Sequence, residues 1–378
     1  MTKENIDNMK LTVNIARILT GVLFIFSGLV KAIDPRGLAY KMQEFFEAWS
    51  HAGFLPGLME NLNHYALVFS IIMITLEVVV GLALLLGFRS KATTWILLLL
   101  ILFFTFLTSY VLFSGKIRAC GCFGDCIPIT PIQTFTKDII LLLLSILLLL
   151  KRKYISPVLQ PMTAGMVILL ATIGTLFLQW NVLRHLPIKD CLAYKIGNNI
   201  LELRKMPANA VPDKYSMSFV YEKEGVKKEF TAENLPDSSW TFLDRKQTLV
   251  EAGKNNVPLI NDFTLVTASG IDTTQAVLSQ PNIYYLLFIQ DLDGYSKKPE
   301  SDKKLLADAK AARIPLLLVA SQSKKVQERF GPDAVVLTTD ATALKTAARA
   351  AAVLYKMEGP VILQKWGWAD FDKVVISK

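Results

Sequence analysis

Three of the chain's four cysteines, Cys120, Cys122 and Cys126, stand within seven residues in the stretch SGKIRACGCFGDCIPITPIQTF, and the fourth is Cys191. Cysteines this close together permit three kinds of site: a disulfide that only braces a loop, a metal site, or an exchanging redox pair. Structural zinc needs four good ligands, and no histidine lies near the cluster, so we expect no metal site. A CxC ring is small and strained, and strained, exposed disulfides are the labile ones. The spacing therefore favours a redox role, and a structural staple remains the alternative.

The residues around the cluster favour a reactive thiolate. Thr130, Pro131 and Gln133 have the arrangement of a capping box that begins a helix. The cysteines then precede a helix N-terminus, where the helix dipole lowers the pKa of a thiol. We expect Cys120 and Cys122 to form the exchanging pair, with Cys126 and Cys191 as relay or structural partners.

The elements that must position these cysteines are membrane helices. The chain has 378 residues, is 52% hydrophobic and has only 19% charged residues, and its long apolar runs precede residue 182. Five segments are long enough to cross a bilayer, at about 11–33, 66–88, 92–114, 131–150 and 162–181. The net charge of +9 comes without a basic stripe interleaved with aromatic residues, so we expect the lipid bilayer as a partner and no nucleic acid.

Lysine and arginine counts orient the spans, because cytoplasmic loops retain positive charge. The N-terminal tail, the turn GFRSKAT and the KRK run at 151–153 fall on one face when sides alternate along the chain. We therefore expect a multi-pass protein of the cytoplasmic (inner) membrane with a cytoplasmic N-terminus. The cysteine loop, Cys191 and the C-terminal region would then lie in the periplasm or outside the cell, where disulfides persist.

One carboxylate lies in the middle of a predicted span. A charge at the position of Glu77 costs at least about 3 kcal/mol on insertion scales, so we expect it to face the bundle interior with a partner. Arg17 in the first span is the best candidate, either at a proton-accepting or quinone-facing site or as a pair that fixes helix packing. Lys31 and Lys137 are expected to snorkel to the interface. Asp138 is expected to stabilise the start of the fourth long helix, because the helix dipole favours a carboxylate there.

The membrane half resembles the DoxX-like superfamily, and its cysteine loop resembles the MauE branch, named for methylamine utilisation. The segments that carry the resemblance are ARILTGVLFIFSGLVKAIDP, LEVVVGLALLLGFRSK and CGCFGDC with the KD that follows. The family pattern matches Arg17, Gly28, Lys31, Glu77, Cys120, Cys122 and Asp138. Membership implies a four-helix membrane bundle and thiol or sulfur redox chemistry, with membrane quinone as the electron acceptor.

The second half is predicted to be an α/β domain. Two alternating runs in SMSFVYEKEGVKKEFT indicate a hairpin. From about residue 284 the order is strand (284–290), helix (300–312), strand (315–320), helix (323–330), strand (334–338), helix (341–356) and a strand in GPVILQKW. This order, with Pro360 before the last strand, resembles a TlpA-type thioredoxin-like domain, in which that place holds a cis-proline. The expected C-x-x-C is replaced by DLDGYS, so the domain itself lacks the thiols for disulfide exchange.

Four parts follow from these patterns: a four-helix bundle over 1–155, a fifth transmembrane helix over 156–182, an extracytoplasmic linker with a β-hairpin over 183–261, and a degenerate thioredoxin-like domain over 262–378. The leading hypothesis is a membrane thiol:quinone oxidoreductase acting on an extracytoplasmic thiol protein. The alternative is a non-enzymatic membrane scaffold or assembly factor with structural disulfides.

Overall fold

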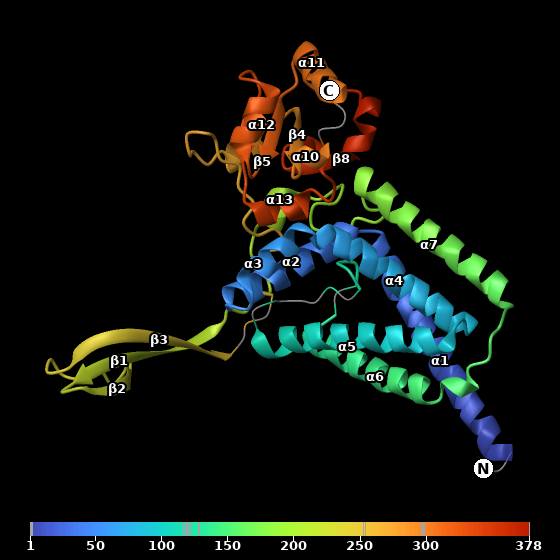
Figure 1. Ribbon diagram of the computed structural model, residues 1–378. Coiled ribbons are helices and arrows are strands. Elements are labelled where there is room, and N and C mark those ends of the chain that lie inside the picture. The colour runs from blue at the N-terminus through green and yellow to red at the C-terminus, as the bar shows by residue number, and fades with distance from the viewer. Residues whose placement is uncertain are drawn as a thin grey trace.

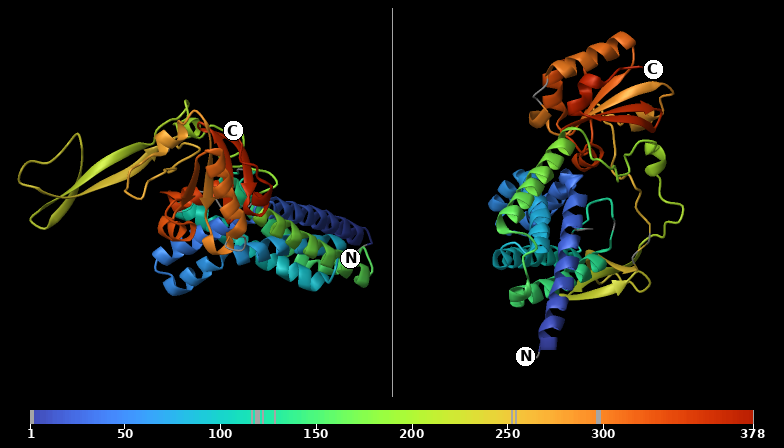
Figure 2. Two further views of the ribbon diagram at one scale, coloured as in Figure 1. Left: turned by 90° about the horizontal axis from the view of Figure 1, so that it is seen from above. Right: turned by 90° about the vertical axis from the view of Figure 1, so that its right-hand side faces the viewer.

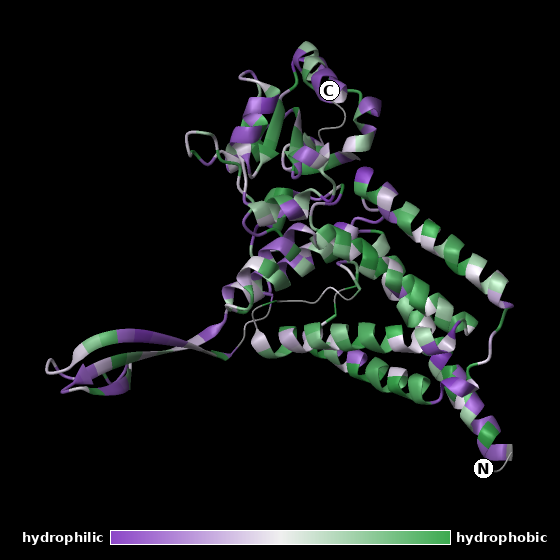
Figure 3. Ribbon diagram, in the orientation of Figure 1, coloured by the Kyte–Doolittle hydropathy of each residue, from purple (hydrophilic) through white to green (hydrophobic). Residues whose placement is uncertain are grey.

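The computed structural model describes residues 3–115, 117, 121, 123–127, 129–251, 253, 255–295 and 299–377. Five of its helices are long and apolar enough to cross a membrane. These are α1 (Lys3–Ala32), α4 (Ala66–Leu86), α5 (Ser90–Ser114), α6 (Pro131–Leu150) and α7 (Pro161–Arg184). The five predicted spans are thereby confirmed, and Figure 3 colours most of their residues as hydrophobic.

The helices α1, α4, α5 and α6 pack together, and α7 lies against α4. Gly21 and Gly28 let α1 approach α4 closely: a Cβ at Gly21 would lie 2.6 Å from the Leu85 side chain, and one at Gly28 would lie 2.6 Å from Val78. Two shorter helices, α2 (Pro35–His51) and α3 (Pro56–His64), connect α1 to α4. The bundle core is built from apolar residues such as Val13, Leu97 and Leu148.

A three-stranded antiparallel sheet stands apart from the rest of the chain (Figure 1). It has the order β2-β1-β3 and consists of β1 (Lys214–Lys223), β2 (Val226–Thr231) and β3 (Thr241–Glu251). The turn between β1 and β2 is Glu224–Gly225, both with positive φ. The antiparallel pairing of β1 with β2 confirms the predicted hairpin. Gly225 suits this turn because positive φ values match the twist of the flanking strands.

The C-terminal part is a mixed α/β domain around a five-stranded sheet of order β6-β5-β4-β7-β8. The strands β4, β5 and β6 are parallel, whereas β7 and β8 are antiparallel. Almost every residue of β4 is buried, as expected of a central strand covered on both faces. The domain has these bounds: α9 Thr274–Leu278, β4 Ile283–Ile289, α10 Leu292–Tyr295, α11 Pro299–Ala312, β5 Leu316–Ala320, α12 Ser323–Phe330, β6 Val335–Thr338, α13 Ala341–Ala347, β7 Ala352–Glu358, β8 Val361–Gly367 and the 3₁₀ segment η2 Trp368–Lys373.

Two local predictions for this domain are wrong. The helix expected over 341–356 ends at Ala347, and residues 352–358 form β7. The alanine-rich run favours a helix locally, but pairing with β4 buries Ala352, Val353 and Leu354 at the centre of the sheet. Pro360 lies in the hairpin between β7 and β8, and no cis peptide bond occurs in the described part of the chain.

The segment after α7 belongs structurally to this domain. Tyr194 and Ile200, the latter in the short helix α8 (Ile200–Leu203), are buried in the core with Phe263 and Phe288. Figure 2 shows the domain resting on the end of the bundle where α2 and the C-terminal end of α7 lie. The strap 185–199 therefore connects the membrane helices to the α/β core directly.

Candidate functional site

The cysteine loop is covalently tied to the strap after α7. Cys126 forms a disulfide with Cys191 across 65 residues of sequence. The bond agrees with the expectation that both residues lie on one side of the membrane, because α6 and α7 return the chain to the same end of the bundle. Cys120 and Cys122, predicted to form the exchanging pair, lie outside the described residues.

The loop ends at the N-terminus of α6, as the sequence predicts. Thr130 Oγ1 accepts a hydrogen bond from the Gln133 backbone N–H, and the Gln133 side chain accepts one from the Thr130 N–H. Pro131 occupies the first turn. This capping box satisfies two otherwise unpaired backbone donors and fixes the loop at the positive end of the helix dipole.

A buried ion pair lies in the bundle beneath the loop. Glu77 accepts hydrogen bonds from Lys31 Nζ and from Ser27 Oγ, and Lys31 and Glu77 are both almost fully buried. The prediction that Arg17 pairs with Glu77 is wrong: Arg17 Nη1 donates to the Ser156 carbonyl oxygen at 2.9 Å. The prediction that Lys31 snorkels to the interface is also wrong, because its ammonium group is buried against Glu77 inside the bundle.

A second charged pair lines the same interior space. Lys137 donates a hydrogen bond to Asp138 Oδ1, and its ammonium group lies 5.4 Å from the centre of the Phe123 ring in the cysteine loop. Asp138 is buried, and its Oδ2 has no hydrogen-bond partner within the described chain. Thr130 is the N-cap of α6, as predicted, and Asp138 follows as the eighth residue of that helix.

These residues enclose a cavity of about 20 Å³ lined by Lys31, Glu77, Phe123, Lys137 and Asp138. Such a volume holds one water molecule, whereas ligand pockets typically measure 300 Å³ or more. Glu77 faces this cavity, and Arg17 does not line it. Within the described residues, the two side chains expected to face a quinone, Glu77 and Arg17, thus do not line a common cavity.

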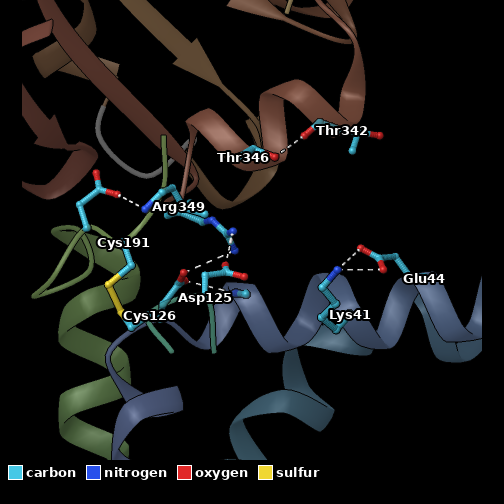
Figure 4. A network of polar contacts seen from close by, with 12 residues as sticks. Lys41, Glu44, Asp125, Cys126, Cys191, Thr342, Thr346 and Arg349 are labelled. Carbon is cyan, nitrogen blue, oxygen red and sulfur yellow. Dashed lines mark hydrogen bonds and ion pairs between the residues drawn. A yellow bond between two sulfur atoms is a disulfide. The ribbon is translucent and has the colours of Figure 1, made fainter. Parts of the chain in front are cut away.

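The α/β domain is joined to the bundle by a buried arginine beside the disulfide (Figure 4). Arg349 Nη2 donates to Asp125 Oδ2 at 2.7 Å, and Arg349 Nη1 lies 3.4 Å from Asp34 Oδ2. Burial raises the pKa of the Asp34 carboxyl, and the Arg349 guanidinium partly offsets that rise. Burial opposes the charge on Arg349, but the carboxylates of Asp34 and Asp125 raise its pKa overall.

The strap carries a second buried pair. Lys365 of β8 donates to Asp190 Oδ2 at 2.6 Å and to the Tyr194 carbonyl oxygen at 2.9 Å. Burial lowers the pKa of Lys365, and the Asp190 carboxylate partly compensates. Asp125 and Asp190 each directly precede a bonded cysteine. Both aspartates therefore pair with a cation of the α/β domain.

The edge of the domain that lacks C-x-x-C faces the bundle. Arg36 of α2 donates to Gln290 Oε1 at 3.2 Å and lies 3.8 Å from Asp291, both directly after β4. The backbone N–H groups of Gln290 and Asp291 both donate to the Ala351 carbonyl oxygen. At the other end of the interface, His185 Nδ1 lies 2.7 Å from Asp370 Oδ2. The residues directly after β4, where the resemblance led us to expect C-x-x-C, thus contact the membrane region.

Sequence reasoning missed Asp34, Asp125, Asp190, Arg349 and Lys365. One signal for two of them is present in the sequence, since Cys126 and Cys191 are each preceded by aspartate, in GDC and KDC. The cations that pair with them lie more than 170 residues away from their partners. No local pattern marks those cations.

The fold and this site define a multi-pass membrane protein with a mixed α/β domain docked beside a disulfide-linked loop. Residues 9–151 match the model of the family described as methylamine utilisation protein MauE, so the membrane region is of the MauE type. A domain of unknown function (DUF8463) matches residues 215–252, which form most of the β1–β3 sheet.

A curated relative is Protein TlpB of Flavobacterium psychrophilum, which is 34% identical over 135 residues. The match covers 35% of each chain, so the chain spans about a third of the length of this relative. No solved structure matches the chain.

Proposed function

We propose that the protein is a membrane thiol–disulfide redox protein whose exchanging pair is Cys120 and Cys122. The observation that carries the proposal is the Cys126–Cys191 disulfide. Four cysteines allow three connectivities within one chain. With Cys126 and Cys191 bonded to each other, Cys120 and Cys122 remain as the two cysteines available for exchange.

The proposed reaction is a transfer of two electrons between a client dithiol and this pair. A client thiolate attacks one sulfur of a Cys120–Cys122 disulfide and forms a mixed disulfide, and the second client thiolate then displaces the remaining cysteine. The client is oxidised to a disulfide, and Cys120 and Cys122 are reduced to thiols. The α/β domain takes no electrons, because no cysteine follows Cys191 in the sequence.

Orientation supports the same proposal. Positive charge in the N-terminal tail, at residues 89–91 and at 151–153 assigns that end of the bundle to the cytoplasm. The strap, which is bonded to the cysteine loop through Cys191 and Cys126, and the α/β domain lie at the opposite end (Figure 1). We therefore propose that exchange takes place on the extracytoplasmic face of the inner membrane, where client disulfides persist.

Membrane quinone is the acceptor that the resemblance implies for reoxidation of the pair. Because Glu77 and Arg17 do not form a common site, no step is assigned to a quinone at those residues. The buried charges of Lys31, Glu77 and Asp138 instead support a polar interior next to the loop.

Differential alkylation of the full-length protein in nanodiscs tests the proposal. Mild dithiol should reduce Cys120 and Cys122, and an added client disulfide or a short-chain quinone should reoxidise them, while the Cys126–Cys191 bond persists. A Cys122→Ser variant is the matched control and should exchange no electrons. A pair that stays locked in one redox state under every condition contradicts the proposal; reoxidation by the client disulfide but not by quinone removes only the quinone part.

The second candidate is a non-enzymatic scaffold, favoured by the absence of C-x-x-C in the docked domain and by a disulfide that joins two structural segments. Mass-spectrometric disulfide mapping separates the two functions. Two bonds that both resist mild reductant support the scaffold.

A further inference from the structure

The turn between α2 and α3 exposes an uninterrupted apolar surface. Residues 51–58, with the sequence HAGFLPGL, are all exposed, and we call them the α2–α3 corner. Phe54, Leu55 and Leu58 leave 59%, 56% and 50% of their surface uncovered. No lysine, arginine, aspartate or glutamate occurs between Glu47 and Glu60. Large apolar side chains that gather on a surface without charges between them mark a place that contacts lipid or another molecule.

The backbone where α2 enters the corner is hydrogen-bonded within the chain. Gly53 has a φ of +80°, its N–H donates to the Ser50 carbonyl oxygen, and the Phe54 N–H donates to the Trp49 carbonyl oxygen. This is the Schellman arrangement that ends many helices at a glycine. These groups therefore need no water as a partner, which is the condition for backbone placed among lipids.

Leu55 has a strained backbone conformation within the corner. Its φ of 41° and ψ of 59° are left-handed, and no side chain caps the helix α3 that follows it. A leucine adopts this conformation reluctantly, and strain of this kind clusters at functional sites. More than half of the side chain is uncovered, so packing within the described chain compensates little of the strain.

Aromatic contacts place the end of α2 at the depth of the membrane spans. The Trp49 ring centre lies 5.9 Å from that of Phe106 in α5, and the Phe46 ring centre lies 6.4 Å from that of Phe69 in α4. Phe106 lies eight residues before the end of α5, and Phe69 lies three residues after the start of α4. At a rise of about 1.5 Å per residue, these positions are roughly 12 Å and 5 Å inside the ends of the two spans. The C-terminal half of α2 is therefore level with apolar parts of both spans.

The corner continues the surface that the spans present to lipid. Tyr65, Val68 and Ile72 are about half exposed and share one face at the start of α4, because they are three and four residues apart. Phe106 and Phe113 are exposed on α5. Figure 1 shows α2 and α3 at the end of the bundle where α4 begins and α5 ends. A soluble partner at the corner would have to reach residues that adjoin these lipid-facing side chains.

The charges near the corner indicate an apolar contact. The chain contains no lysine or arginine between Lys41 and Arg89, so no cation of this segment attracts anionic headgroups. Glu47 accepts a hydrogen bond from Asn63 Nδ2, and Glu60 is exposed on α3; both lie outside the corner. His51 is the one titratable side chain within the corner.

We propose that the α2–α3 corner inserts into the leaflet on the side of the α/β domain, with Phe54, Leu55 and Leu58 at the boundary between headgroups and acyl chains. Interfacial elements bury apolar side chains at that depth, and tryptophan and tyrosine are enriched there, as Trp49 and Tyr65 are beside the corner.

Insertion would hold α2 at the membrane surface. Phe45 of α2 packs against Ile117 of the cysteine loop, and Arg36 of α2 contacts the residues after β4. The corner thereby fixes the height of both the cysteine loop and the docked domain above the lipid. This inference does not depend on the proposed thiol exchange.

Lipid quenching measures the insertion directly. A fluorescent amino acid is incorporated by stop-codon suppression at Phe54 or, separately, at Leu58 of the full-length protein in nanodiscs, so that the native cysteines remain. Lipids brominated in the upper part of the acyl chains should quench both labels more strongly than lipids brominated near the chain ends. A label at Ile173, halfway along α7, should show the opposite order. The matched control is a label at Ile271 of the α/β domain, which is 63% exposed and should not be quenched.

A charged substitution gives a second readout. Phe54→Glu should reduce the quenching of the label at Leu58, because a carboxylate among acyl chains is unfavourable. Ile271→Glu should leave that quenching unchanged. Equal quenching of the Leu58 label in both variants would show that Phe54 is not in contact with lipid.

Three outcomes of the quenching experiment overturn the inference. Equally weak quenching at Phe54 and Ile271 places the corner in water. A blue-shifted emission at Phe54 without lipid quenching means that protein covers the corner: a second copy of the chain if the shift requires two copies in one nanodisc, and another protein otherwise. Quenching that requires anionic lipids and disappears at high salt means that charge holds the corner. All three leave the redox state of Cys120 and Cys122 untested, so the proposed exchange stands or fails separately.

Discussion

Replacing Arg349 by methionine should loosen the α/β domain from the bundle. The substitution keeps an unbranched apolar side chain but removes the guanidinium group, which lies 5.2 Å from the centre of the Tyr40 ring and faces Asp34 and Asp125. Removing one partner of a buried ion pair costs about 3–5 kcal/mol, because the remaining charge is left uncompensated. The side chains of Asp34 and Asp125 are 19% and 32% exposed, which places the effect at the lower end, about 3 kcal/mol, or roughly 150-fold in the docking equilibrium.

The loosening should depend on pH in a defined direction. Burial already raises the pKa of Asp34 in the docked state, and Arg349 opposes that rise, so the variant raises this pKa further. A carboxyl whose pKa is higher in the docked state than in the undocked state favours docking when it is protonated. This contribution is complete at a pH below the undocked pKa, near 4, and is lost as the pH rises through the docked pKa. Docking of Arg349→Met should therefore be weak at pH 7 and partly restored as the pH approaches 4.

Amide hydrogen exchange in nanodiscs measures this equilibrium locally. At pH 7, the amides of α13 and of the N-terminal half of α2 should lose protection in Arg349→Met, whereas β4 at the centre of the sheet should not. Lys310→Met, which removes an exposed cation from α11, is the matched control. Unchanged exchange in α13 and α2, or a loss that does not diminish at lower pH, would show that Arg349 does not hold the interface by compensating buried carboxylates.

Three further changes test other parts of the site. Glu77→Gln leaves the Lys31 ammonium uncompensated inside the bundle and should destabilise the detergent-solubilised protein by about 3 kcal/mol. The double variant Glu77→Gln/Lys31→Met should regain most of the lost melting temperature. Equal melting temperatures of the single and double variants would refute the pairing. Cys191→Ser should release Cys126 as a free thiol that maleimide labels in native membranes, and continued protection of Cys126 would mean that it has another partner. Thr130→Ala removes the helix cap at a cost of about 1 kcal/mol, so the first turn of α6 should exchange its amides several times faster, and an unaltered rate would show that the cap contributes nothing.

Much of the fold is determined by local sequence pattern. The five spans follow from uninterrupted apolar length, which a bilayer requires of any helix that crosses it. The start of α6 follows from Thr130, Pro131 and Gln133, because a capping box is made by residues three apart. The hairpin of β1 and β2 follows from two alternating runs around Glu224–Gly225. In each case the residues that determine the structure are neighbours in the chain.

The tertiary structure alone decided the rest, because it depends on contacts between residues far apart in sequence. Residues 352–358 carry a helical pattern and become a strand because β4 pairs with them. The sequence placed Glu77 and its candidate partner inside the bundle, but helix rotation and depth selected Lys31 over Arg17. Likewise the four cysteines left three pairings open, and the return of α6 and α7 to one end of the bundle brought Cys126 to Cys191. The same docking placed Arg349 between Asp34 and Asp125. The one sequence signal for this site is the aspartate that precedes each bonded cysteine.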